Sequence, residues 1–454
     1  MMNPLSLSDL AAMSGANLIT GDSEQLVQRV CKDTRRLERG DLYVAIRGER
    51  FDGNHYIAEA ANKGAVAALC DGEAPTGLPR EFGILSTPDS LTGLMLLASA
   101  WRSRLQLRAV AITGSSGKTS VKDFTATVMR SRFKTTATEG NLNNNIGLPL
   151  SILNANTEDQ IAVWEIGMNH RGEIAPLAGL ARPEIGIITG IGMAHIEYLG
   201  SRNEIAREKG DLLERLPSTG WAIIPAHDDF AAELRSRTSA GVVETGFNTG
   251  NLRATRIVPE ITGSRFVIEG DFGTTEANLP IPGRHMVGNA LMAVAAGLLS
   301  GISLAECAAA LTGCSLTGGR LARFVHRGVT LIDDTYNANP DSMVAALQTL
   351  AELPAEGRKI ALLGKMGELG NHAAAAYAGV GEAAASLVDS LICVGAEASA
   401  IGDAAIAAGH RDVRFVSDNN EAALLLPLIT QVGDFVLLKA SRSARMEEIL
   451  HKLR

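Results

Sequence analysis

Short runs of apolar residues recur along the chain, and stretches with helical spacing lie between most of them. Nine such runs fall into two series, at 109–112, 161–166, 185–189 and 221–224, and then at 329–333, 359–363, 390–394, 413–416 and 435–438. Short apolar runs bounded by turn residues predict buried strands, and strands that alternate with helices predict parallel sheets. The chain is therefore expected to contain two α/β regions, the second of them doubly wound.

Two further stretches show different patterns. Strands are predicted at 40–46 and 66–69, with a helix over 56–63 between them. Thr87-Pro88 disfavours a helix at 86–89, where a domain boundary is expected, and the next segment is expected to open with a helix. At 252–279, alternating residues and glycine turns predict an antiparallel insert. We expect an α/β fold of three domains: a small α/β N-terminal domain at 1–86, a central parallel-sheet domain with a phosphate-binding loop at 87–314, and a C-terminal Rossmann-like, doubly wound domain at 315–454.

Composition narrows the class of protein. The 454 residues carry a formal net charge of −8 without a long basic run, which argues against a nucleic-acid partner. The five cysteines contain no C-x-x-C pair, which argues against a disulfide framework or a zinc site. The start of the chain does not have the pattern of a signal peptide, and polar residues and glycines interrupt the apolar stretch 291–311. We expect a cytoplasmic protein with no membrane span.

A glycine-rich turn follows the predicted strand 109–112 and precedes a predicted helix. Backbone N–H groups of such a turn can converge on phosphate oxygens, and the helix N-terminus adds its dipole. The common phosphate-loop motif has a glycine at the position of Ile112, so this loop is a shorter form. Lys118 is predicted to neutralise the β- and γ-phosphates and Thr119 to hold Mg²⁺. The candidate nucleotide-binding residues of the loop are Gly114, Ser115, Ser116, Gly117, Lys118, Thr119 and Ser120.

Two ionisable residues follow later strands of the same series. Glu165 ends the predicted strand 161–166, and His195 comes soon after the strand 185–189. The carboxyl ends of parallel strands face the crevice where α/β proteins bind ligands, so both are candidate ligands of a divalent ion. Considered singly, a glutamate at a strand end is more often solvated, and a lone histidine is more often structural.

The order of these features, a short phosphate loop, a strand-end glutamate and then Ala194-His195, resembles the Mur ligase family. The resemblance implies an enzyme that joins a carboxylate to an amine through an acyl phosphate made with ATP, and it extends over nearly the whole chain. It implies that Asn141 and Asn144 line the substrate cleft, that Asn289 contacts the adenine and that Asp334 contacts the ribose. It also implies that Arg320 reaches the ATP phosphates.

Within the family, four segments are similar to the branch that adds D-alanyl-D-alanine to UDP-N-acetylmuramoyl-tripeptide. They are Asp33-Thr34-Arg35 with Gly48 to Gly53, Tyr336 to Pro340, Gly367 to Gly370 and Lys439 to Ser443. The resemblance implies that Asn337 contacts the nucleotide. It further implies that the two substrates are bound by Thr34, Arg35, Arg50, Asn339, Ser441 and Arg442.

Lys209 occupies the position at which this family often carries a lysine carbamylated by CO₂. A carbamate is an anion and can bind Mg²⁺, which reverses the electrostatic role of the lysine. The alternative is an exposed helix lysine, the usual environment of this residue type. The resemblance thus implies ATP and two Mg²⁺ ions, the first held by Thr119 and Glu165 and the second by His195 and carbamylated Lys209. The implied catalytic residues are Lys118, Glu165, His195, Lys209 and Arg320.

The implied partners are small molecules, UDP-N-acetylmuramoyl-tripeptide and D-alanyl-D-alanine, and we expect a monomer. The third residue of the tripeptide, diaminopimelate or lysine, stays open, as does the general base for the amine. Two alternatives also stay open: a ligase of the same family with another amine substrate or a folate, and a nucleotide-operated switch that binds ATP without ligation.

Overall fold

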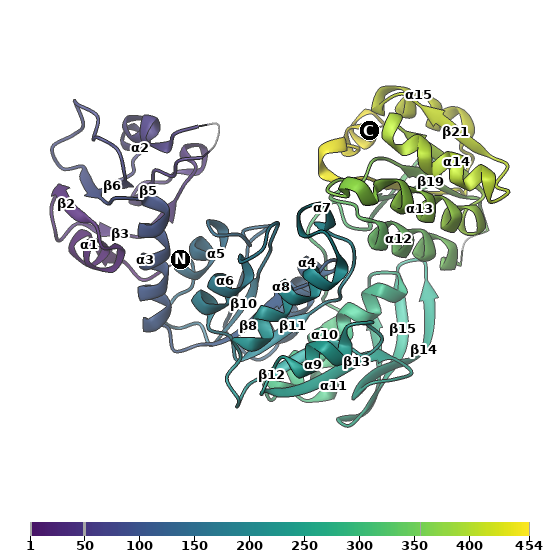
Figure 1. Ribbon diagram of the computed structural model, residues 1–454, viewed down its shortest axis with the longest axis horizontal. Helices are drawn as coiled ribbons and strands as arrows, with labels where there is room; N and C mark the ends of the chain where they lie inside the picture. Colours follow the sequence, from purple (N-terminus) through teal and green to yellow (C-terminus); the bar gives the residue numbers. More distant parts are fainter. Residues whose placement is uncertain (1, 49–50, 355, 454) are drawn as a thin grey trace. The chain divides into compact units, whose positions relative to one another are not determined.

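The computed structural model describes residues 2–48, 51–354 and 356–453. The chain divides into two compact units. The first consists of residues 1–111, 133–168 and 172–184, and the second of residues 112–132, 169–171 and 185–454. Figure 1 colours the chain along its sequence, and each unit is described by itself below. The limits expected for three domains stay a prediction.

A five-stranded sheet lies at the start of the first unit, in the strand order β2-β7-β6-β5-β4. The strands are β2 (Asn17–Thr20), β4 (Arg29–Cys31), β5 (Asp41–Val44), β6 (Ala67–Cys70) and β7 (Gly83–Ser86), and all neighbours are parallel except β2 and β7. The accompanying elements are β1 (Leu5–Ser6), α1 (Leu7–Ser14), β3 (Leu26–Val27), η1 (Thr34–Arg36), η2 (Gly53–Tyr56) and α2 (Ile57–Asn62). The two strands and the helix expected here are confirmed as β5, β6 and α2.

The rest of the first unit contains three parallel-sheet strands with helices. Its elements are α3 (Ser90–Arg104), β8 (Arg108–Thr113), β9 (Thr135–Ala137), α5 (Gly147–Leu153), β10 (Ile161–Glu165) and α6 (Ile174–Ala181). β10 lies between β8 and β9 and is parallel to β9. The side chain of Asp89 caps α3 by accepting a hydrogen bond from Thr92 N. β8 crosses into the second unit, to which its last two residues, Ile112 and Thr113, belong.

The second unit begins with the helix after the phosphate loop and continues with six strands in the order β16-β15-β14-β13-β12-β11. Neighbouring strands from β11 to β14 are parallel, and β14 to β16 are antiparallel, which confirms the predicted insert. The elements are α4 (Lys118–Arg130), β11 (Ile185–Ile188), α7 (Ile196–Leu199), α8 (Arg202–Glu214), β12 (Trp221–Pro225), α9 (Ala231–Ser236), β13 (Gly241–Phe247), β14 (Leu252–Glu260), β15 (Gly263–Gly270), β16 (Gly273–Leu279), α10 (Arg284–Leu299) and α11 (Leu304–Leu311).

The C-terminal part of the second unit is a six-stranded sheet in the order β17-β18-β22-β19-β20-β21, parallel except for β17. Its elements are β17 (Ala322–His326), β18 (Val329–Asp334), α12 (Pro340–Glu352), β19 (Lys359–Leu363), η3 (Gly370–His372), α13 (Ala373–Leu387), β20 (Ser390–Val394), η4 (Ala396–Ala398), α14 (Ser399–Ala407), β21 (Val413–Val416), α15 (Asn419–Ile429), β22 (Phe435–Lys439), η5 (Arg442–Ala444) and α16 (Glu447–Leu453). All five strands expected here are confirmed. Figure 1 shows α12 and α13 side by side along this sheet.

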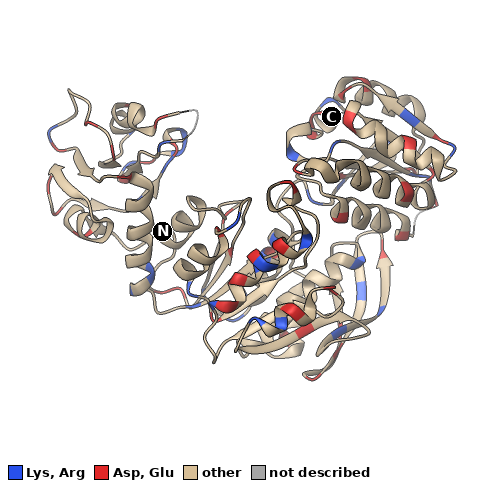
Figure 2. Cartoon of the chain, in the orientation of Figure 1, with Lys and Arg blue, Asp and Glu red and all other residues tan. Residues whose placement is uncertain are grey.

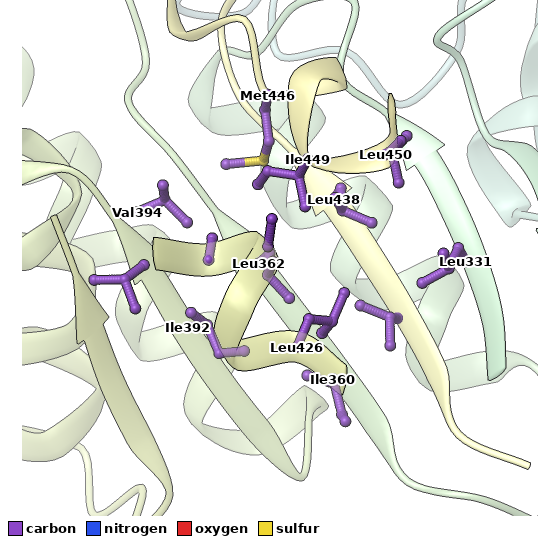
Figure 3. Close-up of a cluster of buried hydrophobic side chains, with 14 of the residues drawn as sticks. Leu331, Ile360, Leu362, Ile392, Val394, Leu426, Leu438, Met446, Ile449 and Leu450 are labelled. Atoms are coloured by element: carbon purple, nitrogen blue, oxygen red, sulfur yellow. The ribbon is translucent and has the colours of Figure 1, made fainter. Parts of the chain in front are cut away.

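One face of this sheet carries a continuous apolar core, shown in Figure 3. Leu331, Ile360, Ile392 and Leu438 come from four neighbouring strands and pack against Leu426 of α15. Because alternate residues of a strand point to the same face, the strands contribute one residue in two to this core. The packing fixes the strand ends on which the polar residues of the site are placed.

Charged residues of both signs are interspersed rather than gathered. In Figure 2, α8 carries basic and acidic residues along its length. Among the residues that the structure describes, no helix combines the length and the apolar character that a membrane crossing requires.

Candidate functional site

The phosphate loop connects the end of β8 to α4, which begins at Lys118. Gly114 and Gly117 have φ angles of +148° and +84°. A Cβ at Gly114 would lie 1.9 Å from Thr189 Oγ1, and one at Gly117 would lie 2.8 Å from Asn289 Oδ1. Both positions therefore require glycine, which alone has the conformation and the space. The loop leads into the N-terminus of α4, whose dipole and first-turn N–H groups favour an anion.

Hydrogen bonds hold the loop against the segment that follows β11. Ser115 N donates to Gly190 O at 2.9 Å, and Gly192 N donates to Ser115 Oγ at 2.9 Å. Lys118 Nζ donates to Gly114 O at 2.8 Å, so its side chain folds back along the loop. From this position a lysine ammonium can reach the β- and γ-phosphates of a nucleotide.

Two predicted residues of the C-terminal part contact the loop within the second unit. The side-chain amide of Asn339 donates to Ser116 Oγ at 2.9 Å. Arg320 Nη2 donates to Thr119 Oγ1 at 3.1 Å, and Arg320 Nη1 is buried without a hydrogen-bond partner in the protein. Buried donors without a partner are rare in proteins, and a ligand is one explanation for them. The arrangement fits a phosphate group beside Arg320.

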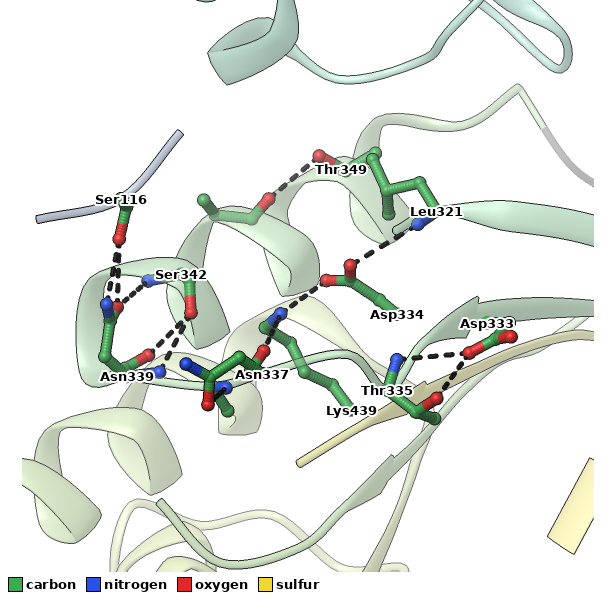
Figure 4. A network of polar contacts seen from close by, with 12 residues as sticks. Ser116, Leu321, Asp333, Asp334, Thr335, Asn337, Asn339, Ser342, Thr349 and Lys439 are labelled. Atoms are coloured by element: carbon green, nitrogen blue, oxygen red, sulfur yellow. Dashed lines mark hydrogen bonds and ion pairs between the residues drawn. The ribbon is translucent and has the colours of Figure 1, made fainter. Parts of the chain in front are cut away.

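A buried lysine organises the segment that carries Asn339, as Figure 4 shows. Lys439 Nζ lies 2.5 Å from Asp334 Oδ2 and donates to Asn337 O at 3.0 Å. The other carboxylate oxygen of Asp334 accepts from Leu321 N at 3.3 Å. Both oxygens of Asp334 thus have partners inside the protein, and Asn337 itself is exposed. Their contacts with the nucleotide stay predictions.

His195 lies at the start of α7 in the left-handed region, with φ +64°. Non-glycine residues in this conformation are uncommon and concentrate at functional sites. Its Nδ1 lies 2.6 Å from Glu368 Oε2. Burial lowers the pKa of His195 despite the opposing effect of Glu368, and the charges of Lys118 and Lys209 lower it further. The imidazole is therefore neutral near pH 7, the form that binds a metal.

Lys209 lies on α8 and is completely inaccessible to solvent. Its Nζ has no hydrogen-bond partner in the protein. Burial lowers the pKa of Lys209 well below its usual value, and the charge of Lys118 adds to the effect. The alternative reading, an exposed helix lysine, is excluded by this burial.

Glu165 ends β10 in the first unit and is 2% exposed. Its Oε1 accepts a hydrogen bond from Asn143 Nδ2 at 2.7 Å, and its backbone N donates to Thr138 Oγ1 at 3.0 Å. Its Oε2 is buried without a partner in the protein. A buried carboxylate oxygen with this unmet capacity fits a cation ligand. Since Thr119 belongs to the second unit, the ion that the two residues were expected to share stays a prediction.

The other predicted residues of the first unit are nearer the surface. Asn141 is exposed, and Asn144 Oδ1 accepts from the backbone N of Ile146 and Gly147, which caps the start of α5. Thr34 begins η1, and exposed Arg35 forms an ion pair with Asp33 at 2.7 Å that lowers the pKa of this carboxyl to about 2. Arg50 lies outside the described residues.

In the second unit, Ser120 is buried in α4 and Asn289 in α10, where Asn289 borders Gly117 of the loop. Ser441 follows β22 and is buried, whereas exposed Arg442 forms an ion pair with Glu447 at 3.0 Å. The loop, Asn289, Arg320 and Asn339 thus come together in this unit. Thr119 and His195 lie there as well, and the charge of Lys118 lowers the pKa of both His195 and Lys209.

Sequence reasoning gave no role to four residues that hold this arrangement: Asn143, Tyr336, Glu368 and Lys439. All four lie in segments whose resemblance to the family was recognised. The sequence identified these segments, but it did not show which residues within them contact one another. No group of three or more His, Cys, Asp or Glu suited to a metal occurs among the described residues.

Family models match most of the chain. The model described as "Mur ligase family, catalytic domain" matches residues 26–87, "Mur ligase middle domain" matches 112–297, and "Mur ligase, glutamate ligase domain" matches 319–442. The matched segments contain most of the predicted site residues, from Thr34 to Arg442.

Individual relatives agree with the family models. The UDP-N-acetylmuramoyl-tripeptide--D-alanyl-D-alanine ligase of Escherichia coli K12 is 36% identical over 436 residues and covers 93% of each chain. The enzyme of that name from Bacillus subtilis 168 is 34% identical over 454 residues and covers 98% of each.

Solved structures agree as well. A crystal structure of MurF from Acinetobacter baumannii has a TM-score of 0.90 at 32% identity and covers 100% of this chain and 99% of that chain. MurF from Thermotoga maritima in complex with ADP has a TM-score of 0.82 at 26% identity and covers 94% and 97%. With three family models along its length and relatives above 30% identity over nearly all of it, the chain belongs to the Mur ligase family.

Proposed function

We propose that the protein is the ATP-dependent ligase that joins D-alanyl-D-alanine to UDP-N-acetylmuramoyl-tripeptide, in the synthesis of peptidoglycan precursors in the cytoplasm. The observation that carries the proposal is the arrangement at the phosphate loop, where Arg320 and Asn339 contact the loop and Lys118 folds along it. The full-length relatives that bear the name of this ligase supply the substrates.

The reaction has two steps. A carboxylate oxygen of the tripeptide forms a bond to the γ-phosphorus of ATP, the bond from this phosphorus to the bridging oxygen breaks, and ADP leaves. The amine of D-alanyl-D-alanine then bonds to the acyl carbon, inorganic phosphate leaves, and the amine gives up a proton. Lys118 and Arg320 neutralise charge on the transferring phosphoryl group, which is the main catalytic task in such transfers.

Mg²⁺ would screen the triphosphate and hold the reacting oxygens in line when bound. The candidate ligands are Thr119 and His195 in the second unit and Glu165 in the first. Asn143 supports this assignment, because its hydrogen bond to Oε1 fixes the carboxylate and leaves Oε2 to a ligand.

Lys209 is proposed to carry a carbamate. Burial lowers the pKa of this amine and so increases its neutral fraction, and the neutral amine is the form that attacks CO₂. The nitrogen bonds to the carbon of CO₂ and loses one proton, giving an anion where the protein had an amine without a partner. Such an anion would lie near the positive charge of Lys118, which favours it, and near the carboxylate of Glu208, which opposes it.

The function is tested by phosphate release from ATP and Mg²⁺ with the UDP-linked tripeptide, with and without D-alanyl-D-alanine. Release that needs both substrates, together with the mass of the UDP-linked pentapeptide, is the expected result. Release that another amine supports better would indicate a different ligase of the family. Nucleotide binding with no release would indicate a switch.

The carbamate is tested by ¹³C NMR after equilibration with ¹³C-bicarbonate. The wild type should show a carbamate signal that Lys209→Met lacks. Lys439→Arg is the matched control, because Lys439 is equally buried but has a carboxylate partner, and this variant should keep the signal. A signal of equal size in Lys209→Met would refute the assignment.

A further inference from the structure

The turn between β18 and α12 places an aromatic ring against Arg320. The Cζ atom of Arg320 lies 3.8 Å from the centroid of the Tyr336 ring. A guanidinium over a ring face at this distance is attracted by the ring quadrupole. The ring face holds the arginine without neutralising it, whereas a carboxylate would compete with an anionic ligand.

The contact fixes the direction in which the guanidinium points. Arg320 has one nitrogen on Thr119 Oγ1, at the first turn of α4, and a second buried nitrogen without a partner in the protein. An arginine side chain has several rotatable bonds, so a single hydrogen bond leaves its orientation poorly determined. The Tyr336 ring supplies the second constraint.

The backbone around the ring is itself held at several points. Tyr336 N donates to Gly319 O at 3.0 Å, which ties the turn to the residue before Arg320. Asp334 Oδ1 accepts from Leu321 N, the residue after Arg320, and Figure 4 shows this bond beside the ion pair with Lys439. The ring and the arginine are thus fixed to the same framework.

We propose that Tyr336 is a positioning residue that holds Arg320 against the start of α4 and presents its guanidinium to the phosphates of a nucleoside triphosphate. The choice of ligand rests on the proposed function. The stacking, the hydrogen bond to Thr119 and the tied backbone do not depend on it.

A double-mutant cycle on the full-length protein tests the proposal. Tyr336→Phe keeps the ring and should stay within about twofold of the wild type in kcat and in affinity for Mg-ADP. Tyr336→Leu removes the ring and should lower kcat by about 5- to 30-fold, the range of a partly desolvated cation–π contact. In an Arg320→Met background, Tyr336→Leu should have no further effect, because its action passes through the arginine.

Phe230→Leu is the matched control, since the Phe230 ring lies beneath Arg202, 5.2 Å from its Cζ, and has no place in the site. It should leave kcat and the affinity for Mg-ADP unchanged. A Tyr336→Leu protein with wild-type kcat, or one that loses the same factor with and without Arg320, overturns the proposal. If the wild type binds Mg-ADP but ligates nothing, the proposed function fails. The role of Tyr336 is then still decided by the same double-mutant cycle, with the affinity for Mg-ADP measured in place of kcat.

Discussion

Lys209 and Lys439 are two lysines of the second unit that solvent hardly reaches, with exposed fractions of 0% and 3%. The ammonium group of Lys439 has a carboxylate, Asp334, at 2.5 Å and the carbonyl of Asn337 at 3.0 Å. Lys209 has no hydrogen-bond partner in the protein, and the nearby charge of Lys118 repels its protonated form. The same residue type is thus an ion-pair partner in one place and, in the other, an amine whose pKa is lowered by burial.

The difference shows that the role of a buried lysine follows from its neighbours. A cation that is buried beside an anion ties chain segments together, as Lys439 does at the ends of β18 and β22. An amine that is buried without a hydrogen-bonded anion has a lowered pKa, which increases the fraction of the nucleophilic neutral form. The first environment builds a framework, and the second prepares a group for chemistry.

The largest effect on stability is expected from methionine substitutions compared in CO₂-free buffer. Lys439→Met should lower the free energy of unfolding by about 3–5 kcal/mol, because it leaves the buried carboxylate of Asp334 unpaired. Lys209→Met should raise it instead, because it removes the cost of burying an amine that the unfolded chain keeps protonated. Urea unfolding followed by circular dichroism measures both, and equal losses would remove the distinction.

Removing the charge of Lys118, which acts on Lys209, should have a large effect on turnover. Lys118→Gln should lower kcat by about 100- to 1,000-fold, the range for loss of one electrostatic contact in a transition state. It should also raise the pKa of Lys209, so that less neutral amine and a weaker carbamate signal remain at fixed CO₂. Lys134→Gln, which changes an exposed lysine paired with Glu158, is the control and should alter neither.

Acidification should lower the free energy of unfolding by a smaller amount, through the buried histidine His285. Burial lowers the pKa of His285 to about 4, against the opposing effect of Asp334. Between pH 6.5 and about 4 the unfolded chain binds a proton that the folded protein does not, so stability should fall with decreasing pH. The total is at most about 3 kcal/mol. His285→Gln should flatten this part of the curve, and His451→Gln, at an exposed histidine, should not.

The most gradual effect is the alkaline counterpart at Lys209, because it is spread over the widest pH range. Because the folded pKa of Lys209 lies well below 10.5, the unfolded chain holds a proton that the folded protein has lost. Without CO₂, stability should rise with pH below 10.5 by up to about 1.4 kcal/mol per unit, and Lys209→Met should lose this slope. Lys63→Met, at an exposed lysine paired with Glu59, should keep it. A wild type without the slope would contradict the neutral amine.

Most strands were predictable because their apolar runs are buried on both faces. The strands β12, β19 and β20 have nearly continuous apolar sequences and were expected at their observed places. Two strands without a buried apolar run were missed, β17 and β9. β17 alternates between exposed and half-buried residues, and β9 has three half-buried residues, so neither shows a clear apolar run. These strands are stabilised by pairing with a neighbouring strand, and the local sequence pattern does not reveal that pairing.

The candidate site shows the same division. Glycines that have no room for a Cβ, the lysine after them and the strand-end glutamate are local features, and a linear motif was enough to find them. The left-handed conformation of His195 was not predictable, because non-glycine residues seldom adopt it. The partners of these residues come from distant parts of the sequence, as Glu368 does for His195.

The sequence by itself determined the α/β class, the phosphate loop and the candidate chemistry, because these depend on residue type and on short-range spacing. Only the tertiary structure decided the charge and the orientation of the groups. Burial of Lys209, the ion pair of Lys439 and the Tyr336 ring against Arg320 bring together residues that are far apart in the chain. The pKa of an amine and the direction of a guanidinium depend on such neighbours, and folding alone supplies them.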